Sequence, residues 1–236
     1  MSLVRIVGTI LLFSVSGVIA AEPDAVIQVH ADRTIAKISP FTTGACIEDV
    51  NHEIYGGLYS QMVFGESFQE PPITDSPPGL PIVCAANCLQ PDGQNDNGWD
   101  QGLVFLSPSH VWVQSSAHVT RMISKNNLPR CVATECQSPN DALDVTSRIS
   151  EDGKILVLQV VNSENRPLST RLNIVGFDLT GRVVKISQIA GHLDERNQET
   201  DPDRIRPADR FLYPEFDAAA STYIFPPQSF SILRFE

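Results

Sequence analysis

Two short apolar runs of this chain each lead to a polar side chain that could bind a ligand through hydrogen bonds. The first run begins at Gly44 and reaches Glu48, ahead of a Gly-Gly break at residues 56–57. The second covers residues 82–90 and ends in Gln90, followed by a polar loop. In (β/α) barrels, side chains at the carboxyl ends of the strands build the active site. A carboxylate accepts hydrogen bonds and an amide both accepts and donates them, so Glu48 and Gln90 could bind a polar ligand.

Other catalytic and metal-binding patterns fail at individual positions. The His-Glu pair at residues 52–53 begins like a zinc motif, but glycine occupies position 56, where the second histidine is needed. The stretch 94–98 is similar to a calcium loop whose first and twelfth positions would be Gly93 and Val104, and neither is a ligand type. The sequence has no Gly-x-Ser-x-Gly motif, phosphate-binding loop or CxxC pair.

Three further side chains have a structural interpretation beside a chemical one. His110 and His118 fall on a predicted helix, eight residues apart and without an acidic partner, so we expect both to be structural. Trp99 could stack on a sugar ring, or it could cover the apolar base of its loop.

The five cysteines are an odd number and cannot form a fully paired disulfide framework. Cys131 and Cys136 are close enough in sequence for a small-loop disulfide, which export would permit. Cys46 and Cys84 lie in apolar runs and are expected to be buried as small hydrophobic residues.

Charge and the first residues suggest an exported protein. The formal net charge is −11 and the pI is about 4.8, which argues against binding nucleic acid through phosphate contacts. Residues 1–21 carry Arg5, an apolar core and small residues at a cleavage position, as in a secretory signal peptide. A membrane anchor is the alternative, but the core is shorter than the ~20 apolar residues of a span. We expect a secreted or periplasmic protein without a membrane partner after signal removal.

The pattern of elements changes along the chain. Strands are expected at residues 25–31 and 34–39, and a helix from an N-cap at Ser107 with Pro108 at its first position to Ser124. Five prolines in residues 70–81 exclude a regular element and mark either a linker or the seam of a missing insert. Beyond residue 129 we expect mainly β structure, with an exposed loop at residues 191–210. The expected strands are residues 143–149 and 154–161, joined by a turn at residues 151–153, and residues 171–175, 182–189 and 229–235.

Several stretches together resemble one enzyme family. They are the run to Glu48 and residues 87–90, 98–102, 107–112, 119–124 and 223–233. In this order they resemble the α-L-arabinofuranosidases of glycoside hydrolase family fifty-one. The resemblance covers residues 38–70, as the start of the catalytic barrel, and residues 82–236, as its last unit and a C-terminal domain.

The resemblance implies an activity and a ligand. Family members release terminal arabinofuranosyl groups from arabinan or arabinoxylan by a retaining double displacement, without a metal or cofactor. Glu48 matches the first-strand glutamate and Gln90 the last-strand glutamine that hydrogen-bond the arabinose hydroxyls. The expected partner is therefore an arabinose-containing polysaccharide or oligosaccharide. Oligomeric state does not follow from the sequence.

The centre of the family pattern is missing. The family's acid/base glutamate follows an asparagine on the fourth barrel strand, and this chain contains no Asn-Glu dipeptide. A barrel takes about 250 residues, whereas residues 41–129 provide 89. Strands two to seven, and both catalytic glutamates with them, have no counterpart, so no catalytic residue is assigned. A deletion, a gene-model error and a fragment each explain the gap.

The expected fold class is mainly β. It comprises a C-terminal antiparallel β-sandwich, completed by the N-terminal strand, and an incomplete remnant of a (β/α)8 barrel. The expected domains are the signal peptide (1–21), N-terminal strands that join the sandwich (22–40), the truncated barrel (41–129, seam near 70–81) and the sandwich (130–236). A non-catalytic carbohydrate-binding sandwich and a nonfunctional fragment remain as alternatives.

Overall fold

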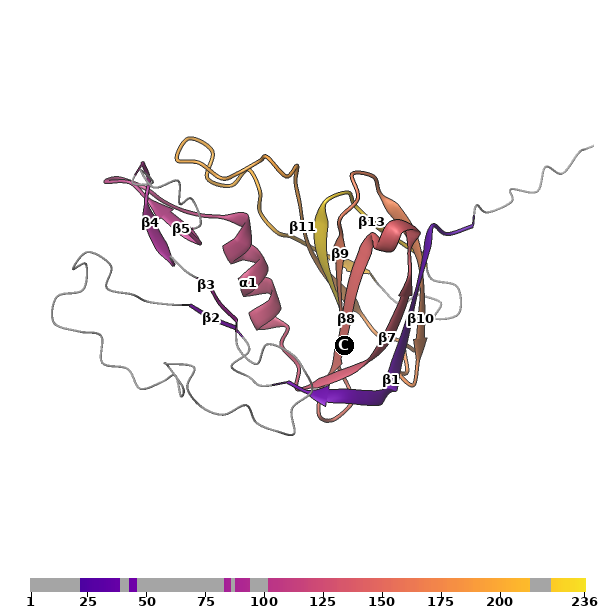
Figure 1. The fold of residues 1–236 in the computed structure, drawn as a ribbon. Coiled ribbons are helices and arrows are strands. Elements are labelled where there is room, and N and C mark those ends of the chain that lie inside the picture. The colour runs from indigo at the N-terminus through magenta and orange to yellow at the C-terminus, as the bar shows by residue number, and fades with distance from the viewer. Residues whose placement is uncertain (1–21, 39–42, 46–82, 86–87, 94–101, 213–221) are drawn as a thin grey trace, which may run out of the picture.

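The computed structural model describes residues 22–38, 43–45, 83–85, 88–93, 102–212 and 222–236. Most of its strands belong to one nine-stranded sheet with the order β12-β11-β14-β9-β8-β7-β1-β10-β13 (Figure 1). These strands are β1 (Ala25–Lys37), β7 (Arg130–Gln137), β8 (Leu143–Ile149), β9 (Leu156–Asn162), β10 (Leu168–Val175), β11 (Val184–Ala190), β12 (Ala208–Leu212), β13 (Thr222–Phe225) and β14 (Ser229–Phe235). A 3-10 turn covers Pro139–Asp141.

The N-terminal strand is part of this sheet. β1 runs antiparallel to β7 and parallel to β10, so the first described segment lies inside a sheet otherwise built from residues 130–235. Its alternate side chains Ala25, Ile27, Val29 and Ala31 are buried, as a strand with one covered face requires. The two strands expected at residues 25–31 and 34–39 are one strand, in which register shifts after His30 and Thr34 take the place of a break.

The large sheet curls so that its two ends face each other across one core. Buried apolar side chains of β1, β7–β11, β13 and β14 form a single cluster that includes Leu158, Leu172 and Phe235. At the open side, Arg210 of β12 donates a hydrogen bond to the Tyr223 hydroxyl of β13, and its guanidinium lies 5.3 Å from the ring centroid. The predicted fold class is confirmed: the protein is mainly β, and strands from both ends of the sheet enclose the core as in a sandwich.

The predicted hairpin is also confirmed. β8 pairs antiparallel with β9 from Leu143↔Asn162 to Ile149↔Leu156. Gly153 in the turn has a φ of +71°, a conformation that glycine adopts without steric cost. The Ser150 hydroxyl accepts the backbone N–H groups of Lys154 and Ile155 and thereby closes the turn.

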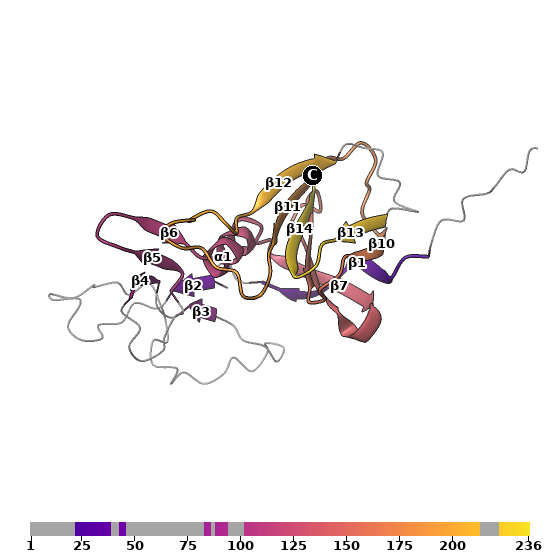
Figure 2. The ribbon, with the colours of Figure 1, turned by 90° about the horizontal axis from the view of Figure 1, so that it is seen from above.

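Helix α1 (Ser115–Lys125) covers the outer face of the curled sheet (Figures 1 and 2). Met122 packs in a second cluster with Val157, Ile189, Ile205 and Ile232. The prediction that this helix begins at Ser107 is wrong. The Ser107 hydroxyl does accept the N–H of His110, but the chain then enters a strand.

The strand before the helix belongs to a small three-stranded sheet of β4 (Leu89–Pro91), β5 (Val104–Leu106) and β6 (Val111–Val113). β4 and β5 are parallel, and β5 and β6 are antiparallel. The β-branched and aromatic residues of Val111–Val113 pair with β5, which explains why helical structure starts only after them.

A separate parallel pair joins β2 (Thr43–Ala45) to β3 (Val83–Ala85). The resemblance made these segments the first and last strands of a barrel, which are neighbours when a barrel closes. Their pairing agrees with that expectation.

Two other expectations are corrected. The segment 191–207 is not simply an exposed loop, because Asn197 and Ile205 within it are buried and residues 208–212 form β12. Cys131 and Cys136 are both free and lie on one strand, β7. Five residues along a strand span about 16 Å, far beyond the Cα separation of a disulfide.

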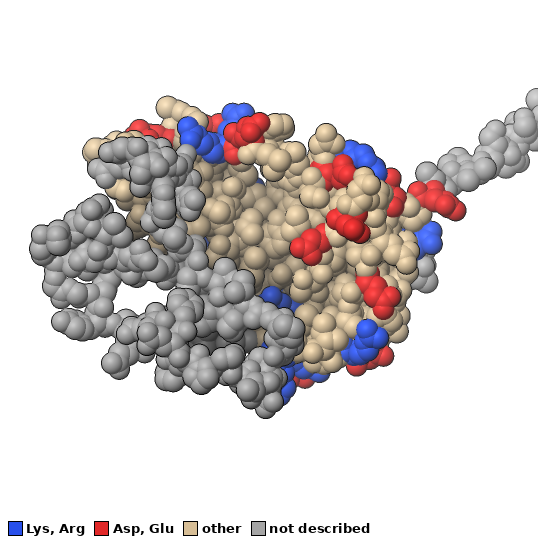
Figure 3. Space-filling model, in the orientation of Figure 1, with Lys and Arg blue, Asp and Glu red and all other residues tan. Residues whose placement is uncertain are grey.

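No helix in the described ranges is long and apolar enough to cross a membrane. Acidic side chains are spread over the curled sheet on the face shown in Figure 3, in keeping with the negative net charge. The expected signal peptide and the proline-rich seam lie outside the described residues.

Candidate functional site

Of the two predicted sugar-binding residues, Gln90 is described and Glu48 lies outside the described residues. Gln90 lies on β4, is 5% exposed, and its Oε1 accepts the backbone N–H of Gly102 at 2.8 Å. A Cβ at residue 102 would approach the Gln90 Cβ to 2.7 Å, so only glycine fits there. Gln90 therefore fixes the start of the β5 segment, and its contact with a sugar remains a prediction.

Gln90 belongs to a row of buried side chains across the small sheet. The strand registers place Gln90 beside Phe105 and Phe105 beside Trp112. The two aromatic rings are stacked, with centroids 6.1 Å apart and planes at 22°. Trp112 is 3% exposed, and its indole Nε1 has no hydrogen-bond partner within the described part of the chain. A buried indole N–H normally finds an acceptor, which makes this atom unusual.

The connecting segment 191–207 is held against this sheet by one asparagine. The Asn197 side chain is 1% exposed, and its Nδ2 donates to the carbonyls of Val113 at 2.6 Å and Ile205 at 2.9 Å. Its Oδ1 accepts the Ile205 N–H at 2.7 Å. The Gln114 side chain bonds both the N–H and the carbonyl of Asn197. These bonds join β6, the helix N-cap and the connecting segment into one unit.

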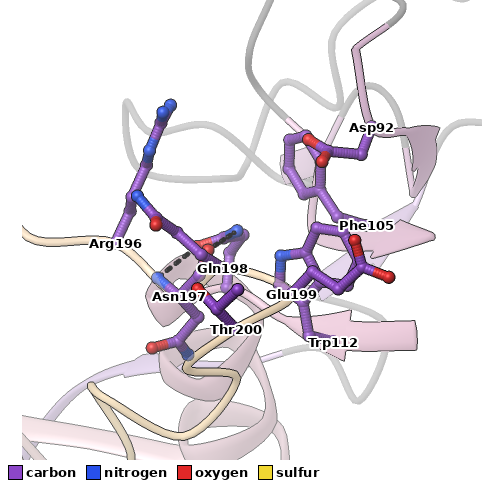
Figure 4. Close-up of a pocket in the computed structure, with 9 residues that line it drawn as sticks. Asp92, Phe105, Trp112, Arg196, Asn197, Gln198, Glu199 and Thr200 are labelled. Carbon is purple, nitrogen blue, oxygen red and sulfur yellow. Dashed lines mark hydrogen bonds between the residues drawn. The ribbon is translucent and has the colours of Figure 1, made fainter. Parts of the chain in front are cut away.

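A pocket of about 300 Å³ lies between the small sheet and the connecting segment (Figure 4). Its lining combines the two stacked rings with polar and charged side chains: Asp92, Phe105, Trp112, Gln114, Arg196, Asn197, Gln198, Glu199 and Thr200. In the close-up, Asp92 and Gln198 stand on opposite sides of the space, and the Trp112 ring forms part of its wall.

At the rim of the pocket, Glu199 ties the connecting segment to the turn between β5 and β6. Its Oε1 accepts the Ser107 hydroxyl at 2.7 Å and lies 2.9 Å from His110 Nδ1. The hydrogen bond from Ser107 has the largest effect, and together with that of His110 it lowers the pKa of the Glu199 carboxyl below its usual range. The prediction that His110 lies on a helix without an acidic partner is therefore wrong.

This cluster cannot act as a catalytic triad. The Ser109 hydroxyl and Glu199 Oε1 both lie 2.9 Å from the same atom, His110 Nδ1. A triad needs the serine on one ring nitrogen and the carboxylate on the other. His118 does lie on α1, and desolvation there lowers the pKa of its ring, as expected for a structural histidine.

In the part of the chain that the structure describes, no group of three or more His, Cys, Asp or Glu side chains could hold a metal ion. Trp99 and the calcium-like stretch 94–98 lie outside it. The sequence interpretation missed the pocket, because the lining comes from two segments about 90 residues apart. The only sequence feature that distinguished the connecting segment 191–207 was its charge. It has too few apolar residues to show which of its positions are buried.

Solved structures of α-L-arabinofuranosidases share the fold. The enzyme from Thermotoga petrophila RKU-1, of family fifty-one, aligns with a TM-score of 0.55 and 17% identity over 66% of this chain and 34% of its own. The arabinose complex of the Thermotoga maritima enzyme aligns with a TM-score of 0.50 and 18% identity over 57% of this chain and 31% of its own. The likeness is one of fold. This chain spans about a third of these enzymes' length. No family model and no curated protein sequence matches the chain.

Proposed function

We propose that this chain descends from α-L-arabinofuranosidases and binds arabinofuranosyl groups of arabinan or arabinoxylan without hydrolysing them. The observation that carries the proposal is the parallel pair β2–β3. Because the strands are parallel, the chain leaves both at the same edge, and Glu48 and Gln90 follow shortly after them in sequence. The fold likeness to arabinofuranosidases supports the same descent.

We propose binding without cleavage because the chain lacks the carboxyl groups that hydrolysis requires. A retaining glycosidase needs two carboxyl groups about 5 Å apart, one as nucleophile and one as acid/base. The sequence lacks the Asn-Glu pair that would supply the acid/base. Glu48, as the matched first-strand residue, would instead accept hydrogen bonds from sugar hydroxyls.

We also propose that the protein acts outside the cytoplasm, where it would encounter plant polysaccharides. Its support is the charged, apolar and small-residue pattern of residues 1–21. The proposed division of labour is a β domain of residues 130–236 with the N-terminal strand, and a sugar-binding part within residues 41–129.

Calorimetric titration with arabinotriose tests the proposed binding. The purified chain should give a saturable isotherm, and Glu48→Gln should weaken it about tenfold, because a charged acceptor is replaced by a neutral amide. Asp49→Asn, the neighbouring carboxylate, is the matched control and should leave the affinity unchanged. Absence of saturable binding by the folded wild-type chain would contradict the proposal.

A further inference from the structure

The small sheet of β4, β5 and β6 has one buried face and one outward face. Gln90, Phe105 and Trp112 occupy the buried face. The registers of the strand pairs bring the remaining positions together on the opposite face, in two rows of three. One row is Leu89, Val104 and Val113, and the other is Pro91, Leu106 and Val111. Every side chain of these strands on the outward face is therefore apolar.

This outward face is accessible to solvent. Leu89 on one edge strand is 63% exposed and Val111 on the other is 68% exposed, and the four positions between them are half-buried. The sheet lies to one side of the curled sheet, beyond α1 (Figures 1 and 2). A sheet face that meets water normally carries polar side chains. A contiguous exposed apolar face instead indicates an interaction site.

The sequence around this sheet is acidic. Residues 38–120 contain no Lys or Arg, and their acidic residues are Glu48, Asp49, Glu53, Glu66, Glu70, Asp75, Asp92, Asp96 and Asp100. The formal net charge of the chain is −11, so this stretch carries most of the excess negative charge. A second copy of the chain would bring like charges together at the face, whereas a basic partner would be attracted to it.

Two carboxylates lie at one end of the outward face. Asp92 follows β4 directly and is exposed, and its backbone N–H donates a hydrogen bond to the last residue of β5. The Glu199 carboxylate contacts Ser107 and His110 in the turn between β5 and β6. Among the described residues that line the neighbouring pocket, only Arg196 is basic. Negative charge therefore prevails at this end of the face.

The chemistry and size of the face favour a protein segment over other ligands. The face has no aromatic side chain on which a sugar ring could stack. The acidic surroundings repel nucleic acid and anionic membranes. Three strands about 4.8 Å apart make a face about 10 Å wide, which matches the diameter of an α-helix. An amphipathic helix binds such a surface through the apolar side chains along one of its sides.

We propose that the outward face of β4, β5 and β6 is a docking surface for a basic amphipathic helix of another protein. The apolar side of the helix packs on Leu89, Val111 and the four side chains between them. Its Lys and Arg side chains pair with Asp92, Glu199 and the carboxylates of the surrounding sequence. This role is separate from the proposed sugar binding, because Gln90 belongs to the opposite, buried face of the sheet.

Fluorescence anisotropy of labelled helical peptides tests the proposal with the full chain. The probe is an amphipathic peptide of leucine and lysine, about 18 residues or five turns long, with leucine at helical spacing. It should bind saturably, and about tenfold more tightly than a peptide with glutamate in place of lysine or one with the same residues scrambled. Raising the salt concentration from about 0.05 M to about 0.5 M should weaken binding several-fold, because salt screens the charges.

Substitutions at exposed positions locate the binding surface. Leu89→Gln combined with Val111→Thr should weaken binding of the leucine–lysine peptide about tenfold, because apolar contact area is lost. Ile224→Gln combined with Val175→Thr is the matched control. It makes the same kinds of change at exposed positions of β13 and β10 and should leave the affinity unchanged.

Several results would overturn the proposal. They are the absence of saturable binding by the folded chain, equal binding of the glutamate or scrambled peptide, and equal binding by the Leu89→Gln/Val111→Thr variant. Sedimentation of the chain alone at increasing concentration examines a second copy as the occupant. A dimer that forms in the wild type and is lost in this variant would make the face a homodimer interface, and would overturn the proposal as well.

Discussion

Single polar side chains determine how the connecting segment 191–207 meets the small sheet. Asn197 supplies both donors and an acceptor to backbone groups of Val113 and Ile205 from a buried position. Only asparagine or glutamine carries this combination, and glutamine is longer by one methylene. The residue thus positions the segment that forms half of the pocket.

Asn197→Ala should lower the free energy of unfolding by about 3 kcal/mol, because three hydrogen bonds are lost and buried backbone groups are left unpaired. Urea denaturation measures the change. Asn173→Ala, a half-buried position on the outer side of β10, is the control and should stay within about 0.5 kcal/mol of wild type. Equal losses in the two variants would refute the role given to Asn197.

The contribution of Glu199 should depend on pH. Its pKa in the folded protein is lowered from an ordinary value of 4.5 by Ser107 and His110. A lowered carboxyl pKa contributes stability above the ordinary value, and that contribution is lost as the pH falls through the folded value. Glu199→Gln should therefore melt at a slightly lower temperature than wild type at about pH 6, and the difference should shrink as the pH falls below 4.5. A difference independent of pH would contradict this assignment.

At the residue scale, sequence could indicate candidate sugar contacts but not the pocket. Glu48 and Gln90 end apolar runs, and the resemblance to the family identified them as candidates. Trp112 and Glu199 come close together only in the folded protein. The contact between Glu199 and His110 is exposed, so it produces no hydrophobic periodicity in the sequence.

Among the elements, β1 connects the two parts of the large sheet, because it fills the position between β7 and β10. Residues far apart in sequence must therefore meet before the core closes. Such non-local pairing slows folding relative to a hairpin such as β8–β9.

Ile27→Ala should lower the free energy of unfolding by about 3 kcal/mol, because the side chain is fully buried in the core and its removal leaves a cavity. Gln28→Ala, on the opposite face of β1, is the matched control and should cost less than about 1 kcal/mol. If both variants unfold like wild type, β1 does not complete the sheet in solution.

Sequence patterns predicted the elements well where local chemistry decides them. The turn at residues 151–153 and the β-branched runs beside it fixed the β8–β9 hairpin. The same logic failed at Ser107-Pro108, which resembles a helix N-terminus, because pairing of Val111–Val113 with β5 outweighs the local signal. The break expected within β1 failed similarly, since the bulges keep it in one sheet.

For the whole molecule, the similarity to solved enzymes is a similarity of fold. The fold is similar, at 16–18% identity, to that of arabinofuranosidases of which this chain covers 24–34%. The sequence predicted this mainly β architecture because strand alternation and turns are local. It could not predict how the sheet closes, since Arg210 and Tyr223 meet across its two ends.

Hydrolysis of 4-nitrophenyl α-L-arabinofuranoside by the purified, folded chain tests the central claim most directly. The account predicts no release of nitrophenol above the buffer rate, in a sample whose cooperative unfolding shows an intact β domain. An arabinofuranosidase assayed in parallel confirms that the substrate is competent. Turnover that co-purifies with the chain and is abolished by substitution of one of its own carboxylates would contradict the account, because the chain would then contain a working catalytic pair.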